Sequence, residues 1–392
     1  MAAIASSFWG LLDKYAEMRK SLGLPSPGNY ESLHREVRGV LPTVFMIDGA
    51  RFELHSHHNQ SFQTGHTLSW GSAQQPPSYQ FTSAYSTPSV ALVGQVDHDG
   101  SVSARGQYNW IPLPSPPQPS LHDAANSMDP APTPVLPEMP KVTSTSKFQA
   151  LFGAQPANNM VQLEHDHHDL DWSLNAKCVN ANLIDAQPSW SKSHKNSGAT
   201  SVTGTYTLSY LQSLSTSIAL GAELTYQRAT PDLEEPSMAF AMRYAPPPSE
   251  LPTPLAIPAG TPSPFMPVNP KDPTQVFTTT WMPNVGVLNA TYWRRINQRL
   301  EVGSELQLLM TPALSRGGQA AATPGRREGM AAVGFKVDTV FTTIRAMLSS
   351  HGQVSAVLEE KIAPGISLQL CGEIDYARGS AGRVGFGFTF EA

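Results

Sequence analysis

From Asp48 to the C-terminus, apolar and polar residues alternate one by one in segment after segment, and this period of two constrains the fold most. In residues 366–376 one face is apolar and the other is polar and charged, and residues 217–227, 300–310 and 383–390 repeat the pattern. Side chains that alternate in this way lie on opposite faces of a β-strand. The chain is therefore predicted to be all-β from residue 48 to residue 392.

About nineteen strands are predicted, and many have the ~9–11 residues that a tilted strand needs to cross a bilayer. They are placed near residues 51–57, 61–69, 78–86, 89–96, 101–110, 144–152, 158–166, 169–178, 199–210, 214–228, 236–245, 275–282, 284–295, 300–310, 328–337, 340–348, 352–360, 366–376 and 382–391. Most of the 35 prolines lie between these strands. The proline-rich stretches near 111–143 and 246–274 are predicted to be loops, because proline cannot donate to a sheet.

Residues 1–47 follow the helical period instead. An amphipathic helix is predicted over Ser7 to Lys20, and its apolar stripe is expected to pack against the barrel wall or a small partner subunit. The stripe is formed by Phe8, Leu11, Leu12 and Tyr15. Prolines 25 and 27 end this helix, and a second one is predicted from about Tyr30 to Val40, before Pro42. This N-terminal helical segment is expected inside or along the pore of the barrel.

Alternation alone does not say which face is wet, so a set of soluble β domains stays an alternative. Three features favour a barrel whose apolar face meets lipid. The polar faces carry charges and glycines, aromatic residues gather near strand ends as in membrane girdles, and about nineteen strands would enclose a lumen too wide for side chains to fill. The girdle candidates are Trp70, Trp110, Trp281, Tyr292 and Trp293. The charged content of 15% is also low for a soluble domain.

Several function classes find little support. A net charge of −5 gives no reason to expect nucleic acid as a partner. The N-terminus does not have the pattern of a secretory signal peptide. Histidines at 55–58 and 165–168 fall at predicted turns without a second ligand set, so no metal is expected. No phosphate-binding loop or nucleophile motif occurs, and neither an enzyme nor a cofactor is expected.

Four segments carry a resemblance to a known family. Residues 25–37, 48–52, 66–71 and 161–166 resemble the central channel of the translocase of the outer mitochondrial membrane, in its fungal branch. The final strand also fits that family's barrel-sorting signal, which is a polar residue, a glycine and two hydrophobic residues at fixed spacing. Its positions are Arg383, Gly385, Phe388 and Phe390.

This resemblance implies a transmembrane barrel of nineteen strands in the mitochondrial outer membrane. The first and last strands would pair in parallel, and both termini would lie in the intermembrane space. The implied function is the import of precursor proteins. The implied partners are presequences, a receptor, small single-helix subunits, membrane lipids and at least one further barrel.

Basic presequences would be attracted by carboxylates on the inner face. By the alternation, the inward acids are Glu164, Asp166, Asp171, Glu223, Glu301, Glu305, Glu359, Glu373 and Asp375. Inward bases are also expected, at Arg105, Lys177, Lys336, Arg345 and Arg383, so the lining is mixed. A voltage-dependent anion channel of the same fold is the alternative, although the segment 25–37 does not suit it. A bacterial porin is disfavoured by the odd strand number.

Overall fold

The protein is described by a computed structural model. The structure describes residues 18–19, 22–72, 76–111, 142–153, 159–180, 204–230, 233–247, 273–310, 327–377, 379 and 381–392.

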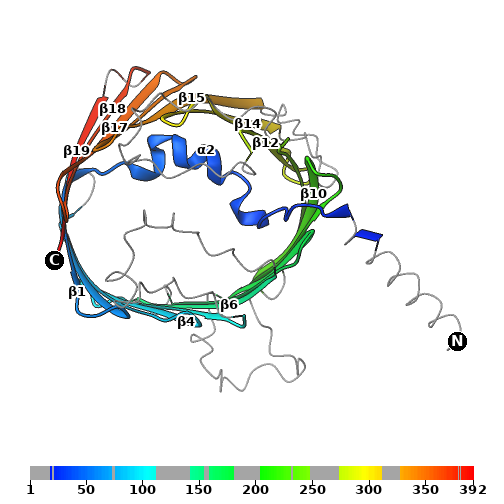
Figure 1. Ribbon diagram of the computed structural model, residues 1–392, viewed down its shortest axis with the longest axis horizontal. Helices are drawn as coiled ribbons and strands as arrows, with labels where there is room; N and C mark the ends of the chain where they lie inside the picture. The colour runs from blue at the N-terminus through cyan, green and yellow to red at the C-terminus, as the bar shows by residue number, and fades with distance from the viewer. Residues whose placement is uncertain are drawn as a thin grey trace, which may run out of the picture.

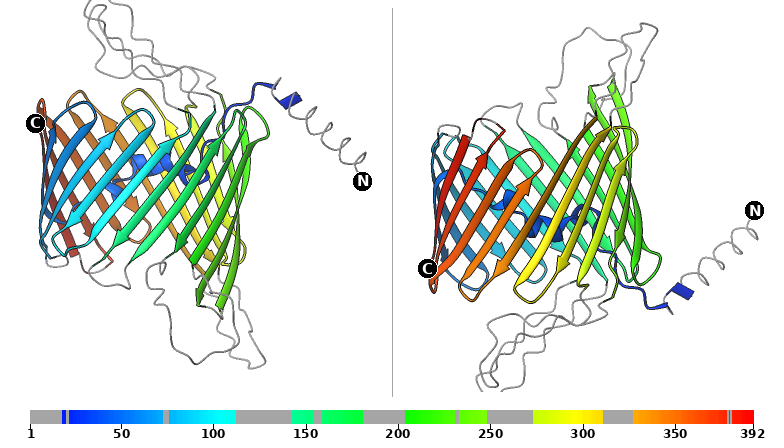
Figure 2. Two further views of the ribbon diagram at one scale, coloured as in Figure 1. Left: turned by 90° about the horizontal axis from the view of Figure 1, so that it is seen from below. Right: turned by 90° about the horizontal axis from the view of Figure 1, so that it is seen from above.

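Nineteen strands form one closed barrel, as the alternation and the resemblance predicted (Figures 1 and 2). The first ten are β1 (Gly49–His57), β2 (Phe62–Trp70), β3 (Ser78–Ser86), β4 (Val90–Asp97), β5 (Val102–Asn109), β6 (Thr143–Phe152), β7 (Met160–His168), β8 (Trp172–Asn180), β9 (Gly204–Ser213) and β10 (Ile218–Thr230). The others are β11 (Leu233–Tyr244), β12 (Gln275–Met282), β13 (Val287–Arg295), β14 (Leu300–Met310), β15 (Arg327–Asp338), β16 (Thr342–Ser349), β17 (Gln353–Ala363), β18 (Ile366–Asp375) and β19 (Ala381–Glu391).

Each strand pairs with its sequence neighbour in antiparallel fashion, and the barrel closes through a parallel pair. In that pair Gly49 of β1 lies opposite Gly385 of β19, and Phe52 lies opposite Phe388. An odd number of up-and-down strands makes the first and the last run in the same direction. Among the described residues every strand therefore has a paired neighbour on both sides, as a sheet in lipid requires.

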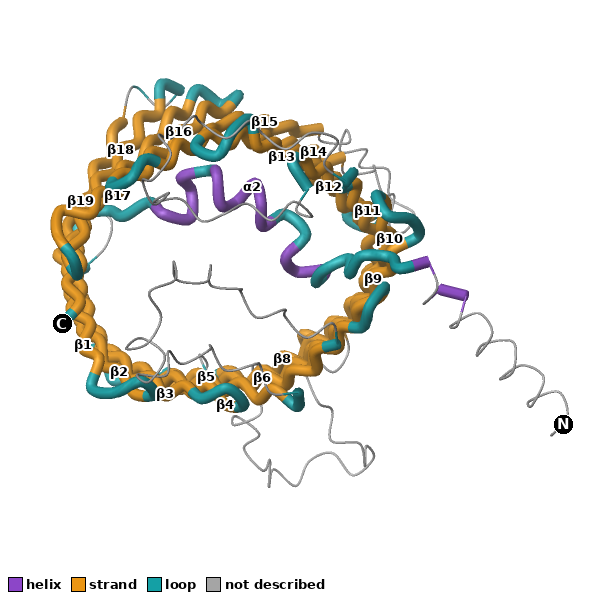
Figure 3. The backbone as a smooth tube through the Cα atoms, in the orientation of Figure 1, coloured by secondary structure: helices purple, strands orange, loops and turns teal. Residues whose placement is uncertain are grey.

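The N-terminal segment enters the lumen and crosses it along the inner wall (Figure 3). Residues 25–47 are called the strap below. Instead of one helix from Tyr30 to Val40, the strap contains a 3-10 turn η1 (Tyr30–Ser32), a helix α2 (Arg35–Val40) and a second 3-10 turn η2 (Pro42–Phe45). The prediction of one continuous helix was therefore wrong. None of the described helices is long and apolar enough to cross a membrane.

The buried core of the barrel lies between the strap and the wall. Val37, Val40 and Leu41 of the strap pack with Trp293 and Met347 of the wall, and Val40 is completely buried. Trp293 points into this core with 5% of its surface exposed. Its prediction as a girdle residue was wrong, because the strap offers an apolar surface inside the lumen. The other large apolar side chains of the strands mostly lie exposed on the outer face, where lipid would cover them.

Candidate functional site: the lumen and its strap

The strap is tied to β7, β8 and β9 at its beginning. The Ser213 hydroxyl donates to the Pro25 carbonyl at 2.7 Å, and the Ser173 hydroxyl donates to the Gly28 carbonyl at 2.6 Å. Lys177 forms an ion pair of 2.9 Å with Glu31. These contacts use inward side chains of β8 and β9, and the Asn29 amide adds a contact to Asp166 of β7, so the strap follows the wall from the point where it enters.

The middle of the strap lies on β13, β14 and β15. A Cβ at Gly303 would lie 3.4 Å from Val40, and one at Gly334 would lie 2.7 Å from Leu41. The missing side chains therefore let α2 approach the wall backbone closely. The Arg243 guanidinium forms an ion pair of 2.8 Å with Glu36, which fixes the polar side of the helix.

The end of the strap lies against β18 and β19. The Ile47 amide donates to the Cys371 sulfur at 3.1 Å. A Cβ at Gly385 would lie only 1.9 Å from the Ile47 carbonyl oxygen. Gly385 of the predicted sorting signal thus also faces the strap. Arg383 is on the same face and pairs with Glu373 at 2.8 Å, whereas Phe388 and Phe390 alternate onto the outer face.

The imidazole of His34, in the strap, lies among inward hydroxyl groups of the wall. Its Nδ1 lies 2.9 Å from the Thr291 hydroxyl and its Nε2 lies 3.4 Å from the Thr280 hydroxyl. Burial lowers the pKa of His34, and the nearby Arg38 lowers it further. The break between η1 and α2 places this ring against the wall, which a continuous helix predicted from the sequence did not suggest.

Two of the predicted acids, Glu164 and Asp166, form a buried network on β7. Lys147 of β6 pairs with Glu164 at 2.7 Å and also with Asp166, and the Asn175 amide donates to Glu164 at 3.0 Å. The Asn29 amide of the strap donates to Asp166 at 3.1 Å. Lys147 was not among the predicted inward bases, although alternation along residues 144–152 places it on the inner face.

Four more predicted acids also have a cationic partner. Asp171 pairs with Arg19, Glu301 with Arg295, Glu359 with Arg345 and Glu373 with Arg383. Asp171 lies in the turn before β8 rather than in a strand from residue 169, so that strand prediction was wrong at its start. The partner bases Arg295 and Arg243 are further inward cations that the sequence analysis did not name.

The remaining three acids differ in their surroundings. Asp375 accepts from the Ala377 amide at 3.0 Å near the end of β18. Glu305 accepts from the Gln307 amide, and Glu223 lies near Glu31 and Lys177. Within the described residues, neither Glu223 nor Glu305 has a cation within ion-pair distance. These two carboxylates therefore lack the ion-pair partner that six of the nine predicted acids have.

The predicted bases are all inward but are not equivalent. Arg345 donates to the Gly39 carbonyl at 3.2 Å and lies over the Phe45 ring at 4.0 Å, so it holds the strap. Lys336 pairs with Asp338 at 2.7 Å within β15. Arg105 of β5 is exposed. Most of the described inward charges of the wall thus pair with the strap or with neighbouring strands.

The two histidine clusters do not form metal sites among the described residues. His165 and His167 lie within β7 rather than in a turn, and His55 and His57 lie within β1, so this detail of the prediction was wrong. Alternate residues of a strand share a face but adjacent ones do not, so the members of either cluster cannot all converge on one ion. The apolar stripe of Phe8, Leu11, Leu12 and Tyr15 lies outside the described residues.

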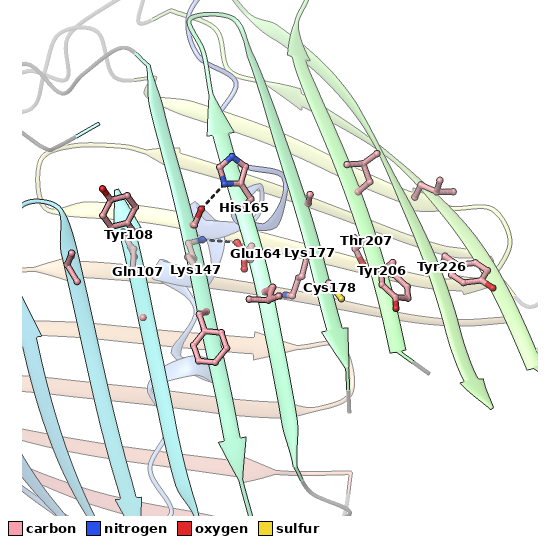
Figure 4. Close-up of a pocket in the computed structure, with 18 of the residues that line it drawn as sticks. Gln107, Tyr108, Lys147, Glu164, His165, Lys177, Cys178, Tyr206, Thr207 and Tyr226 are labelled. Atoms are coloured by element: carbon pink, nitrogen blue, oxygen red, sulfur yellow. Dashed lines mark hydrogen bonds and ion pairs between the residues drawn. The ribbon is translucent and has the colours of Figure 1, made fainter. Parts of the chain in front are cut away.

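The outer face carries a groove of about 820 Å³ across β4 to β10 (Figure 4). Large side chains border it, among them Leu92, Phe148, Tyr206 and Tyr226, while Gly106 and Ala176 are small. One polar pair lies in this apolar surface, because His165 Nδ1 is 2.9 Å from the Ser146 hydroxyl. This groove is not predictable from the residues of one strand, because it depends on which residues of separate strands lie side by side.

Comparison with known proteins identifies relatives over nearly the whole chain. Residues 26–113 and 140–387 match the family model of the eukaryotic porins. Mitochondrial import receptor subunit TOM40 of Saccharomyces cerevisiae is 29% identical over 98% of this chain and 84% of its own length. Mitochondrial import receptor subunit tom40 of Neurospora crassa is 24% identical over 100% of this chain and 90% of its own length. The TOM40 homolog of Xenopus laevis is 22% identical over 87% of this chain and 77% of its own length.

Proposed function

Because the chain belongs to the eukaryotic porin family, we propose that it is the channel through which precursor proteins cross the mitochondrial outer membrane. It acts there as a subunit of a translocase. The observation that carries this function is the similarity to import receptor subunits over 98% of the chain, which includes the strap as well as the barrel. The alternative of a voltage-dependent anion channel is not favoured, since these relatives are import receptor subunits.

Within the lumen, the nine predicted acids are proposed to attract basic presequences to different degrees. A carboxylate that already has a cationic partner offers little net charge to a passing peptide. Glu223 and Glu305 have no such partner among the described residues, so they are the principal candidates for presequence contact. Glu164 and Asp166 instead hold Lys147 and the strap.

Conductance of the purified protein in a planar bilayer, with and without a basic presequence peptide, tests this function. We expect wide, cation-preferring channels that the basic peptide blocks and a charge-reversed peptide does not. The double variant Glu223→Gln, Glu305→Gln should weaken the block, whereas Glu360→Gln on the outer face should leave it unchanged. An anion-preferring pore that is indifferent to the peptide would instead indicate a metabolite channel.

The outer groove across β4 to β10 is proposed to receive a single-helix subunit of the translocase. Small residues such as Gly106 and Ala176 allow a helix to approach a neighbouring backbone closely in lipid. The pair of His165 and Ser146 can hydrogen-bond to a polar side chain of that helix, since polar groups facing lipid are costly without a partner. Receptor contacts, lipid contacts and assembly of two or more barrels are proposed for other parts of the outer face.

A variant with Ala176→Trp tests this docking site. The bulky side chain would fill the groove, so a small subunit should be lost from the purified complex while the barrel remains folded. Leu220→Trp on the outer face of β10 is the matched control. Retention of every small subunit by the Ala176→Trp complex would show that the groove is lined by lipid alone.

A further inference from the structure

The inner face of β2 to β6 is the part of the wall on which no described residue of the strap lies. The strand register identifies its inward residues. Gly387 faces the strap, because a Cβ there would lie 2.7 Å from the Ile47 side chain. Gly387 lies opposite Arg51, Arg51 opposite Ser69 and Ser69 opposite Ser78. Paired residues share a face of the sheet, so the same rule can be followed across β4 and β5 to Lys147 on β6.

Most side chains on this inner face are uncharged and can form hydrogen bonds. The residues that define this surface, called the polar track below, are Gln63, Thr67, Gln80, Thr82, Gln95 and Gln107. Among the described inward residues of β2 to β6, only Asp97, Arg105 and Lys147 are charged. Lys147 is engaged with the acids of β7, and Asp97 is the last residue of β4. Arg105 is the one exposed cation in the middle of the described track, and the residues around it are neutral.

The groups on the polar track are accessible and lightly engaged. Gln80, Gln95 and Gln107 are half-buried. The Ser103 hydroxyl donates to the Gln95 amide oxygen at 3.3 Å, which is a long contact between two neutral groups. By contrast, the strap presents exposed Arg35 and Arg38 to the lumen, since its apolar side is turned to the opposite wall. A basic polypeptide would therefore meet two exposed cations on the strap and a single one, Arg105, on the described part of the track.

An extended polypeptide offers an N–H and a C=O group at almost every residue, whatever its sequence. Amide and hydroxyl side chains can accept a hydrogen bond from such an N–H group and donate one to such a C=O group. Passage also requires contacts that are weak enough to be released, and a densely charged wall would hold segments of opposite sign more tightly than a mostly neutral one. We propose that the polar track is the surface along which the backbone of the translocating polypeptide moves, independently of its charge. This inference rests on the proposed import function.

Site-specific photo-crosslinking in the assembled translocase tests the polar track. A photoreactive residue is placed at Gln95 or, as a matched control on the opposite face, at the adjacent Val96. Three precursors are arrested during import, with acidic, neutral or basic segments in the channel. We expect equal crosslinking at Gln95 with all three and none at Val96. Crosslinking at Glu223 but not at Gln95, or a yield at Gln95 that follows the charge of the segment, would overturn the track and leave the import function intact.

Import rates of charge variants provide a second test. Gln95→Lys should slow basic segments roughly fivefold, as like charges within a few ångströms repel even in water. Gln95→Asn should import at the rate of the unaltered protein. Equal rates for both variants, in complexes of normal size on native gels, would contradict the track. If no precursor can be arrested in the barrel at all, the import function itself fails and the track with it.

Discussion

The wall under the strap and the polar track are parts of one barrel, yet their inward residues differ in kind. Under the strap, Gly303 and Gly334 make room for the helix, and charged residues such as Arg243 pair with the strap. Along the track, neutral side chains such as Gln80 and Gln95 remain half-buried. The difference shows that a charge in the lumen is not by itself evidence of contact with substrate. In this protein most of the described inward charges hold the strap or a neighbouring strand.

Removing a base that pairs with acids of the strap wall, and one within the track, should break this comparison most strongly. Lys147→Met leaves Glu164 and Asp166 buried without their cation, so we expect a loss of about 3 kcal/mol in the free energy of unfolding. Arg105→Met on the track should change it by less than about 0.5 kcal/mol, because Arg105 is exposed. Denaturant unfolding of the refolded barrel in detergent measures both. Lys147→Arg should preserve most of the stability, and equal losses for Lys147→Met and Arg105→Met would refute the distinction between the walls.

Shortening one apolar side chain in the core under the strap and one on the polar track should give the next largest difference in stability. Leu41 is 1% exposed in the core between strap and wall, so Leu41→Ala should weaken docking of the strap by about 2–4 kcal/mol. Val93 lies half-buried on the track, and Val93→Ala should cost less than about 1 kcal/mol. Amide hydrogen exchange over residues 30–47 measures the docking. Unchanged protection of these amides in Leu41→Ala would show that the apolar contacts do not hold the strap.

The alternation of residues was sufficient to predict the nineteen strands and the all-β class, because a strand in a barrel between lipid and water must be polar on one face only. It also predicted that Glu164 lies on the inner face, but not which cation pairs with it. Which side chains of β6 and β7 come within ion-pair distance depends on the register between strands, and a single sequence does not fix that register.

The position of Trp293 was mispredicted for a related reason. An aromatic residue near a strand end is typical of a membrane girdle. Alternation puts the adjacent Tyr292 and Trp293 on opposite faces, but it does not show that the inward one meets the strap. The break in the strap at Leu33 and His34 was also not predictable from helical period alone. At this break His34 contacts the Thr280 and Thr291 hydroxyls, which the fold brings from two other strands.

Filling one of the glycine positions should produce a smaller effect that is local to the strap. A Cβ at Gly385 would overlap the Ile47 carbonyl, so Gly385→Ala must displace this end of the strap at a cost of about 1–3 kcal/mol. Gly372 has nothing within 4 Å of such a Cβ, and Gly372→Ala is the matched control. The measurement is hydrogen exchange of the amides of residues 45–47. It uses refolded protein, so that displacement of the strap is observed without any effect of the variant on barrel sorting. Equal protection in the two variants would mean that Ile47 adjusts without leaving the wall.

Mild acidification should produce the smallest difference, in amide protection, between the strap with its wall and the polar track. Burial lowers the pKa of His34 in the docked strap below its usual 6.5, although Glu305 and Glu36 partly oppose the shift. In the released strap His34 binds its proton more readily than in the docked strap. Above pH 6.5 neither state is protonated, so the docked state keeps its full stability. As the pH falls from 6.5 through the lowered pKa, protonation favours the released strap and docking is weakened. Protection of residues 30–40 should therefore decrease from about pH 7 to about pH 5 after correction for intrinsic exchange. The inward residues described for β2 to β6 include no histidine, so protection there should stay constant. His34→Gln should flatten the response of the strap, and a response that persists in this variant would assign it to another group.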